Sequence, residues 1–196
     1  YPKGETQKLI VDLNHAIYNY DGKVLWASLR MEDPYTLTGY RITNGWAREN
    51  YVYFAIHFSK PVAHYGYRDF GKQNYHGFWR RFDVNHDFPE MAGRKVVAWI
   101  EFEQDDDPIL EVQVALSAVS TNGAGLNLFV EALNDYPLSF DHCYKQARQA
   151  WNDKLGIFEV KGTDDQLAMF YTSLYHTMIN PSIYQDVDGQ YRGVDH

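Results

Sequence analysis

The most polar segment of the sequence runs from Asp186 to Asp195 and reads Asp-Val-Asp-Gly-Gln-Tyr-Arg-Gly-Val-Asp. Its carboxylates could accept paired hydrogen bonds from vicinal sugar hydroxyls, and Arg192 could orient one of them. A ligand-binding loop is one interpretation, and a solvated loop with local Asp turns is the other. A calcium loop of the EF-hand type fits poorly, because that pattern needs further acidic ligands and a Glu at its twelfth position.

Other catalytic patterns are missing from the sequence. It has 8 His and 1 Cys, Cys143, and none of them shows metal-ligand spacing. No glycine-rich phosphate loop follows a strand, and no Gly-x-Ser-x-Gly elbow occurs. The aromatic stretch from Tyr65 to Phe82 also carries three arginines, and a long edge hairpin or a loop over a sheet is favoured there over a binding site.

Composition limits the classes of partner. The chain has 18 Lys and Arg against 26 Asp and Glu, a formal net charge of −8, so it lacks the basic surface that nucleic acid requires. No apolar run approaches the roughly 20 residues of a membrane-spanning helix. Aromatic residues make up 16% of the chain, and Tyr outnumbers Phe by 16 to 11. That bias suits a β-sheet protein or a surface whose rings stack on sugars.

Residues 1–137 show the period-2 alternation of strands with one buried face. The alternating runs are Leu9–Ile17, Val52–Phe58, Val96–Phe102 and Leu110–Ala118, and in the last run the apolar residues are expected on the buried face. Turn signals lie between runs, at Asp21-Gly22, Asn44-Gly45, Lys60-Pro61, Asp105–Pro108 and Asn122-Gly123. Short strands separated by turns predict an antiparallel β-sandwich. The segment from Asn127 to Leu133 fits either a final strand or a short helix.

The period changes to that of helices after Pro137. The first helix is predicted to begin at Ser139 as N-cap and to end at Gly156. Its apolar residues are Phe140, Cys143, Tyr144, Ala147, Trp151 and Leu155. A capping box of Thr163 and Gln166 opens the second helix, and Pro181 limits it. Its predicted buried stripe is Leu167, Phe170, Tyr171, Leu174 and Met178.

These changes of period divide the sequence into three parts. They are a β-sandwich domain at 1–137, expected to be incomplete at its N-terminus, a linker helix with a short extended segment at 138–162, and the start of a helical domain at 163–196. Tyr1 is neither an initiator Met nor part of a signal peptide, and no helix stop precedes His196. We therefore expect the chain to be a piece of a longer protein.

Several segments resemble the exo-acting α-mannosidases of glycoside hydrolase family 92. The strongest match runs from Phe170-Tyr171-Thr172-Ser173-Leu174-Tyr175-His176-Thr177 through Pro181 to the segment Asp186–Asp195. Further matches are Gly45-Trp46-Ala47, Tyr53-Phe54, Phe58-Ser59-Lys60-Pro61, Val112–Ser120 and Ala147–Asn152. The resemblance covers most of the chain.

The resemblance implies a β-sandwich packed on an (α/α)6 barrel, of which this chain holds the later sandwich, the linker helix and the first barrel helix. It also implies an exported, calcium-dependent enzyme that removes terminal α-linked mannose from glycans in the manner of an α-1,2-mannosidase. The resemblance implies that hydrolysis inverts the configuration of the anomeric carbon. The general acid, the general base and the calcium ligands are expected outside this chain. No residue here is therefore assigned as catalytic or as a metal ligand.

The resemblance also places the active site between the two domains. Asp195, then Arg192 and Asp188, are the residues predicted to contact the ring hydroxyls of a terminal mannose. Tyr171 and His176 match the family motif but are expected to serve packing. A non-catalytic carbohydrate-binding or surface-adhesion sandwich is the alternative, although it explains the capping box and the polar loop poorly.

Without the other helices of the barrel, the apolar stripe of the second helix must lie on the sandwich, associate with another copy or fray.

Overall fold

The computed structural model describes residues 1–2, 4–18, 20–69, 90–103, 105–133, 139–180 and 182–193. The chain divides into two compact units, Tyr1–Leu138 with Gln185–His196, and Ser139–Tyr184. The first unit contains the strands β1 (Lys8–Asp12), β2 (Val24–Asp33), β3 (Thr36–Thr43), β4 (Asn50–Phe58), β5 (Val62–Asp69), β6 (Glu90–Gly93), β7 (Val96–Phe102) and β8 (Val112–Ser117). Residues 70–82 of the aromatic stretch Tyr65–Phe82, which was predicted to be a long edge hairpin or a loop over a sheet, lie outside the described ranges.

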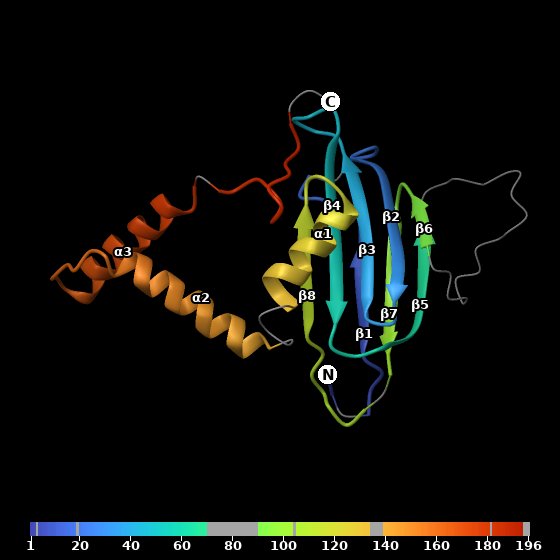
Figure 1. Cartoon of the computed structure of the whole chain (residues 1–196), viewed down its shortest axis with the longest axis horizontal. Coiled ribbons are helices and arrows are strands. Elements are labelled where there is room, and N and C mark those ends of the chain that lie inside the picture. Colours follow the sequence, from blue (N-terminus) through green and yellow to red (C-terminus); the bar gives the residue numbers. More distant parts are fainter. Residues whose placement is uncertain are drawn as a thin grey trace, which may run out of the picture. The chain divides into compact units, whose positions relative to one another are not determined.

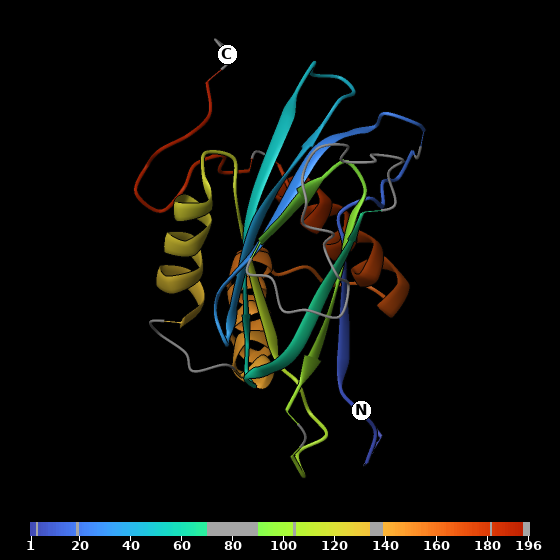
Figure 2. The same ribbon diagram turned by 90° about the vertical axis from the view of Figure 1, so that its right-hand side faces the viewer.

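The first unit is an antiparallel β-sandwich, which confirms the predicted fold class. One sheet has the strand order β6-β2-β3-β4-β8 and the other has the order β1-β7-β5. Every described pairing is antiparallel, and Phe54 of β4, for example, stands opposite Gly39 and Leu116. Figure 2 shows the two sheets as separate layers.

The alternating apolar residues of β4 and β7 build the core between the two sheets. Phe54, Ile56 and Phe58 are buried on one face of β4, and Ala98, Ile100 and Phe102 are buried on β7. The rings of Phe58 and Phe102 meet edge to face, with their centroids 5.1 Å apart. Burial of apolar side chains at about 25 cal/mol per Å² is the main stabilising contribution to such a core.

The sequence correctly predicted a strand at β8, but the prediction that its apolar side chains are buried was wrong. Val114 and Leu116 lie opposite Ile56 and Phe54, on the core-facing side of their sheet, yet they are 57% and 59% exposed. The reason is the position of β8 at the edge of the five-stranded sheet. Figure 1 shows β1, β7 and β5 behind the other strands of that sheet rather than behind β8. The facing layer of described strands does not reach this edge.

A helix, α1 (Thr121–Leu128), stands where Asn122-Gly123 was expected to form a turn. Ser120 caps it, because its hydroxyl accepts a hydrogen bond from the Gly123 amide. A π-helical turn, η1 (Phe129–Leu133), continues the chain, so the segment from Asn127 to Leu133 is helical rather than a strand. Ala124 and Leu128 pack on Ala55 of β4, on the side of the five-stranded sheet away from the core. Figure 1 shows α1 in front of β4 and β8.

The second unit contains two helices, α2 (Phe140–Leu155) and α3 (Asp164–Met178), with the caps that the sequence predicted. Ser139 caps α2, and both hydrogen bonds of the capping box between Thr163 and Gln166 are present. The predicted buried stripes are less buried than expected, because no residue of either helix is fully buried. In the predicted stripe of α2, Leu155 alone is half-buried and the others are exposed. In the predicted stripe of α3, every residue except Phe170 is half-buried.

The two helices of this unit contact each other through few side chains. The rings of Trp151 and Tyr175 meet edge to face at a centroid distance of 4.6 Å. The Tyr171 hydroxyl donates a 2.8 Å hydrogen bond to the carbonyl of Phe158 in the connecting segment. Two helices alone present too little surface to bury their apolar stripes, which explains the shortfall in burial.

Among the described residues, none of the helices has the length and hydrophobicity of a membrane-spanning segment.

Candidate functional site

The polar segment predicted as a site begins with a buried carboxylate. Asp186 is only 5% exposed, and both of its carboxylate oxygens accept hydrogen bonds. The donors are the hydroxyl of Ser117, 2.6 Å from Oδ2, and the amide nitrogen of Asn127, 2.9 Å from Oδ1. Ser117 ends β8, and Asn127 lies in α1. The carboxylate therefore holds the start of the polar segment against the sandwich.

A tight turn follows Asp186. The Gly189 amide donates to the Asp186 carbonyl at 2.8 Å, and the Asp186 amide donates to the Gln190 carbonyl at 2.7 Å. Gly189 has a φ of +83°, a conformation that glycine adopts without the steric cost of a side chain. Asp188 is exposed on this turn, and its two oxygens accept 3.0 Å hydrogen bonds from the backbone and side-chain nitrogens of Gln190.

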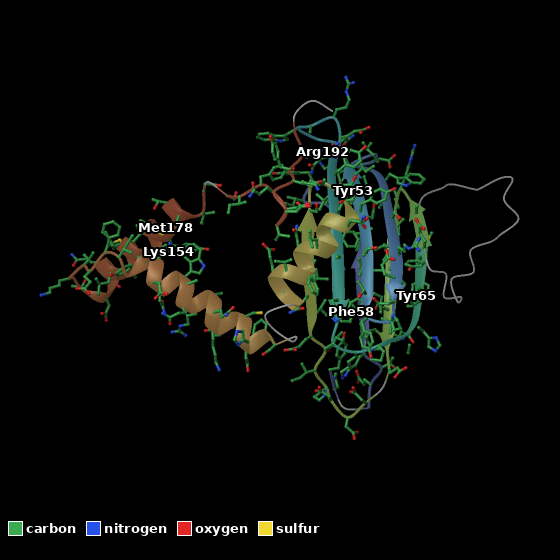
Figure 3. The ribbon with its side chains drawn as sticks, viewed as in Figure 1. Tyr53, Phe58, Tyr65, Lys154, Met178 and Arg192 are labelled. Carbon is green, nitrogen blue, oxygen red and sulfur yellow. The ribbon has the colours of Figure 1, made fainter. Side chains whose placement is uncertain are left out.

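Arg192 lies on a tyrosine of the sandwich. Its guanidinium carbon is 4.0 Å from the centroid of the Tyr51 ring, which is a cation–π contact. The described residues offer this guanidinium no hydrogen bond or ion pair. Its N–H donors therefore stay available for a ligand. Figure 3 shows Arg192 and Tyr53 at the same end of β4, with Phe58 at the other end.

Tyr51 belongs to a row of half-buried tyrosines on the outer face of the five-stranded sheet. Its ring stacks on Tyr53 at 6.2 Å, and Tyr53 meets Tyr40 of β3 at 5.8 Å. The Tyr51 hydroxyl donates a 2.8 Å hydrogen bond to Glu49. This hydrogen bond raises the pKa of the Tyr51 phenol, burial and the Glu49 charge act in the same direction, and the positive charge of Arg192 opposes them. Tyr51 therefore remains a neutral ring at neutral pH.

An exposed tryptophan lies in the sequence between Tyr40 and Tyr51. Trp46, in the segment between β3 and β4, has a fully exposed side chain. Exposed indoles stack well on apolar faces of ligands, and Tyr rings combine an apolar body with a hydroxyl. Together with the free donors of Arg192 and the exposed carboxylate of Asp188, these groups suit a neutral ligand that carries many hydroxyls.

The structure places two of the three predicted contact residues. Asp188 is exposed on the turn and Arg192 is half-buried on Tyr51, while Asp195 lies outside the described residues. Sequence reasoning did not assign roles to Ser117, Asn127 or Tyr51. The only sequence signal for Tyr51 was the excess of tyrosine, and the buried pairing of Asp186 had no local signal.

The described residues do not form a calcium site. No three His, Cys, Asp or Glu side chains converge in the described ranges of the chain. The carboxylate oxygens of Asp186 accept hydrogen bonds from Ser117 and Asn127, and those of Asp188 accept hydrogen bonds from Gln190. A hard cation needs several oxygen ligands that converge on one point, and these two carboxylates alone do not supply them.

The fold and the loop together define an antiparallel β-sandwich protein with a ring-lined polar surface at the end of β4. Two family models match the sequence. They are the glycosyl hydrolase family 92 N-terminal domain, over residues 1–117, and the glycosyl hydrolase family 92 catalytic domain, over residues 123–196. The chain belongs to glycosyl hydrolase family 92, which confirms the resemblance seen in the sequence. Ser117 and Tyr51 belong to the first match, and Asp186 and Arg192 to the second.

Solved structures of this family resemble the whole chain. The GH92 α-mannosidase BT3965 from Bacteroides thetaiotaomicron is 31% identical, with a TM-score of 0.82, and the match covers 100% of this chain and 25% of that one. The same relative has been solved in complex with mannoimidazole. The inverting GH92 mannosidase BT2199 from the same species is 26% identical, with a TM-score of 0.74, over 98% of this chain and 24% of that one.

The chain spans about a quarter of the length of these solved relatives. No curated protein matches the sequence significantly.

Proposed function

We propose that the protein containing this chain is an exo-acting α-mannosidase that removes terminal α-linked mannose from glycans with inversion. The observation that carries this proposal is the match of both domains of a glycosyl hydrolase family, together with an α-mannosidase relative aligned over the entire chain. An inverting mannosidase among the relatives supports the stereochemical part.

In this proposal the residues of the chain bind and orient the sugar. Asp188 and Asp195 accept hydrogen bonds from ring hydroxyls, and Arg192 donates to a ring or hydroxyl oxygen from its fixed place on Tyr51. The tyrosine row and Trp46 supply apolar faces. Inversion requires a general acid and a general base roughly 6.5–9.5 Å apart, so that a water molecule fits between them. Those two carboxylates are assigned outside this chain.

Calcium dependence and export belong to the same proposal. In this proposal the calcium ligands lie outside this chain, as the family resemblance implies, and no three His, Cys, Asp or Glu side chains converge in the part of the chain that the structure describes. Loss of activity in chelator, with recovery on adding calcium, would support that part. Recovery of the full-length protein from the periplasm, cell surface or medium would support export.

The proposal is tested with the full-length protein and α-1,2-linked mannobiose, following the products by proton NMR. The expected result is mannose release with the β-anomer appearing first, before mutarotation. An α-linked glucose disaccharide serves as the control substrate and is expected to remain intact. Release of α-mannose first would contradict inversion.

The alternative is a non-catalytic carbohydrate-binding or adhesion module. The tyrosine row and the exposed Trp46 favour it as strongly as they favour the enzyme. Mannobiose binding by the full-length protein without any hydrolysis would support the alternative and overturn the proposed activity.

A further inference from the structure

We propose that Asp186 is a positioning residue for the sugar-binding loop, and that its pairing with Ser117 and Asn127 sets the affinity of the site for mannose. This inference rests on the proposed function. Asp186 is 5% exposed, so it has almost no surface of its own to offer a ligand. It acts through the residues that follow it, Asp188 and Arg192.

The first support is the completeness of its hydrogen bonds. A buried carboxylate is costly unless its oxygens accept hydrogen bonds, and here Ser117 and Asn127 supply one to each oxygen. The same two partners are themselves fixed. The Ser117 oxygen accepts from the Val119 amide at 2.9 Å, and the Asn127 nitrogen also donates to the Leu116 carbonyl at 2.9 Å. The carboxylate therefore has one well-defined position.

The second support is the space that Gly123 leaves for this carboxylate. A Cβ added at Gly123 would lie 2.2 Å from Asp186 Oδ2 and 2.8 Å from Ser117 Oγ. Both distances are too short for a carbon atom. Glycine is an unfavourable residue inside a helix, and at this position of α1 the Asp186 carboxylate explains its presence. Gly125, in the same helix, has no such neighbour, because an added Cβ there would meet nothing within 4 Å.

The third support is the connection from Asp186 to the exposed part of the loop. The Val187 amide donates to the Asn127 side-chain oxygen at 2.9 Å, so Asn127 holds two successive residues. The turn that carries Asp188 is closed by the backbone of Asp186 at both its amide and its carbonyl. Arg192 then rests on Tyr51. The loop is thus attached to the sandwich at Asp186 and again at Arg192, and displacement of Asp186 moves the turn between these two residues.

The test compares variants of the full-length protein by their affinity for mannoimidazole, measured by calorimetry well below the Tm of each variant. Gly123→Ala pushes the carboxylate out of place, and Asp186→Asn removes its charge while keeping its shape. Each is expected to weaken mannoimidazole binding by at least about tenfold, whereas the matched control Gly125→Ala stays within about twofold of the parent. A merely structural role would lower the Tm of the first two variants without changing the affinity of the folded protein.

A second measurement covers the case in which Asp186→Asn does not fold. Asp186→Ala combined with Ser117→Ala removes both oxygens that a Cβ at residue 123 would meet, so adding Gly123→Ala to that pair is expected to weaken binding no further. For the folded variants the kinetic signature is a raised KM for mannobiose with kcat changed less, because the loop holds the sugar and does not react with it.

The outcomes separate this inference from the proposed function. If the parent binds mannoimidazole and Asp195→Ala weakens that binding, while Gly123→Ala and Asp186→Asn keep parental affinity, the positioning role is overturned and the proposed function stands. If the parent neither binds mannoimidazole nor hydrolyses mannobiose, both fail.

Discussion

The guanidinium of Arg192 lies on the ring of Tyr51, with 4.0 Å between the guanidinium carbon and the ring centroid. A tyrosine of the sandwich thus holds a cation from the segment matched as the catalytic domain. An aromatic face attracts a guanidinium without using its N–H groups, which an acidic partner would occupy. Arg192 can therefore be held in place and still donate to a ligand.

This contact predicts a difference between two variants of Tyr51 in the full-length protein. Tyr51→Leu removes the ring, and loss of a cation–π contact of about 0.5–1 kcal/mol should lower kcat/KM for mannobiose by roughly two- to fivefold. Tyr51→Phe keeps the ring and loses only the hydrogen bond to Glu49, so it should stay near the parent. Equal losses in both variants would show that the hydroxyl matters and the ring does not.

Sequence periodicity was sufficient to predict the sandwich because the information is local. In β4 and β7 every second residue is apolar, and those residues form the core. The same reasoning was wrong about burial in β8, because whether Val114 is covered depends on the extent of the facing sheet. Alternation shows that two faces differ, but it does not show what lies over either of them.

Helix α1 was missed for a similar reason. Asn122-Gly123 is a turn signal by composition, yet Gly123 is required by the carboxylate of Asp186, which is distant in the sequence. The helix caps at Ser139 and Thr163 were predicted correctly, since each cap depends on residues within one turn. At the candidate site, the exposed polar residues were found from their types, whereas Ser117 and Asn127 are recognisable only from the folded structure.

A buried lysine leads to a pH prediction. Lys60 is buried and its ammonium group lies 2.5 Å from Asp105 Oδ1, with a further hydrogen bond to the Asp107 carbonyl. The hydrogen bond from Lys60 lowers the pKa of Asp105 below its ordinary value of 3.8. A carboxyl whose pKa is depressed by folding stabilises the protein above its unfolded pKa, and the contribution is lost as the pH falls through the folded pKa.

Asp105→Asn should therefore lower the Tm of this chain most at neutral pH. The difference from the parent should shrink once the pH falls below about 4, as the parental carboxyl begins to protonate. Asp106→Asn is the matched control, since that exposed neighbour makes no hydrogen bond with the described residues. A pH-independent difference for Asp105→Asn, measured by thermal melts, would contradict the ion pair as the cause.

The second unit predicts self-association of the isolated chain. Phe140 on α2 is 73% exposed and Met169 on α3 is 65% exposed. Apolar surface of this kind favours association. Sedimentation velocity should show a sedimentation coefficient that rises with concentration, and Phe140→Gln with Met169→Gln should reduce that rise. Val114→Gln, on β8 of the sandwich, is the comparison variant. If only Val114→Gln reduces the rise of the sedimentation coefficient, the contact between chains lies on β8 and not on the helices.

The isolated 196-residue chain should also lack hydrolytic activity. No residue in it is assigned as general acid or base, and loss of a general acid or base typically costs about 10²–10⁴ in rate. Incubation at high concentration with α-1,2-linked mannobiose should give no mannose above a buffer control, while the full-length protein releases it. Turnover by the isolated chain at an ordinary glycosidase rate would show that a catalytic pair lies within residues 1–196.

The central claim is that the segment Asp186–Asp195 contacts the terminal mannose, and kcat/KM of Asp195→Ala in the full-length protein tests it most directly. An Asp that accepts hydroxyl hydrogen bonds in a water-poor site should contribute about 1.5–3 kcal/mol, so kcat/KM should fall by at least about tenfold with the fold intact. Arg192→Lys should also lower it, because lysine lacks the planar fork. If Asp195→Ala stays within about twofold of the parent, the segment is a structural loop and the claim is wrong.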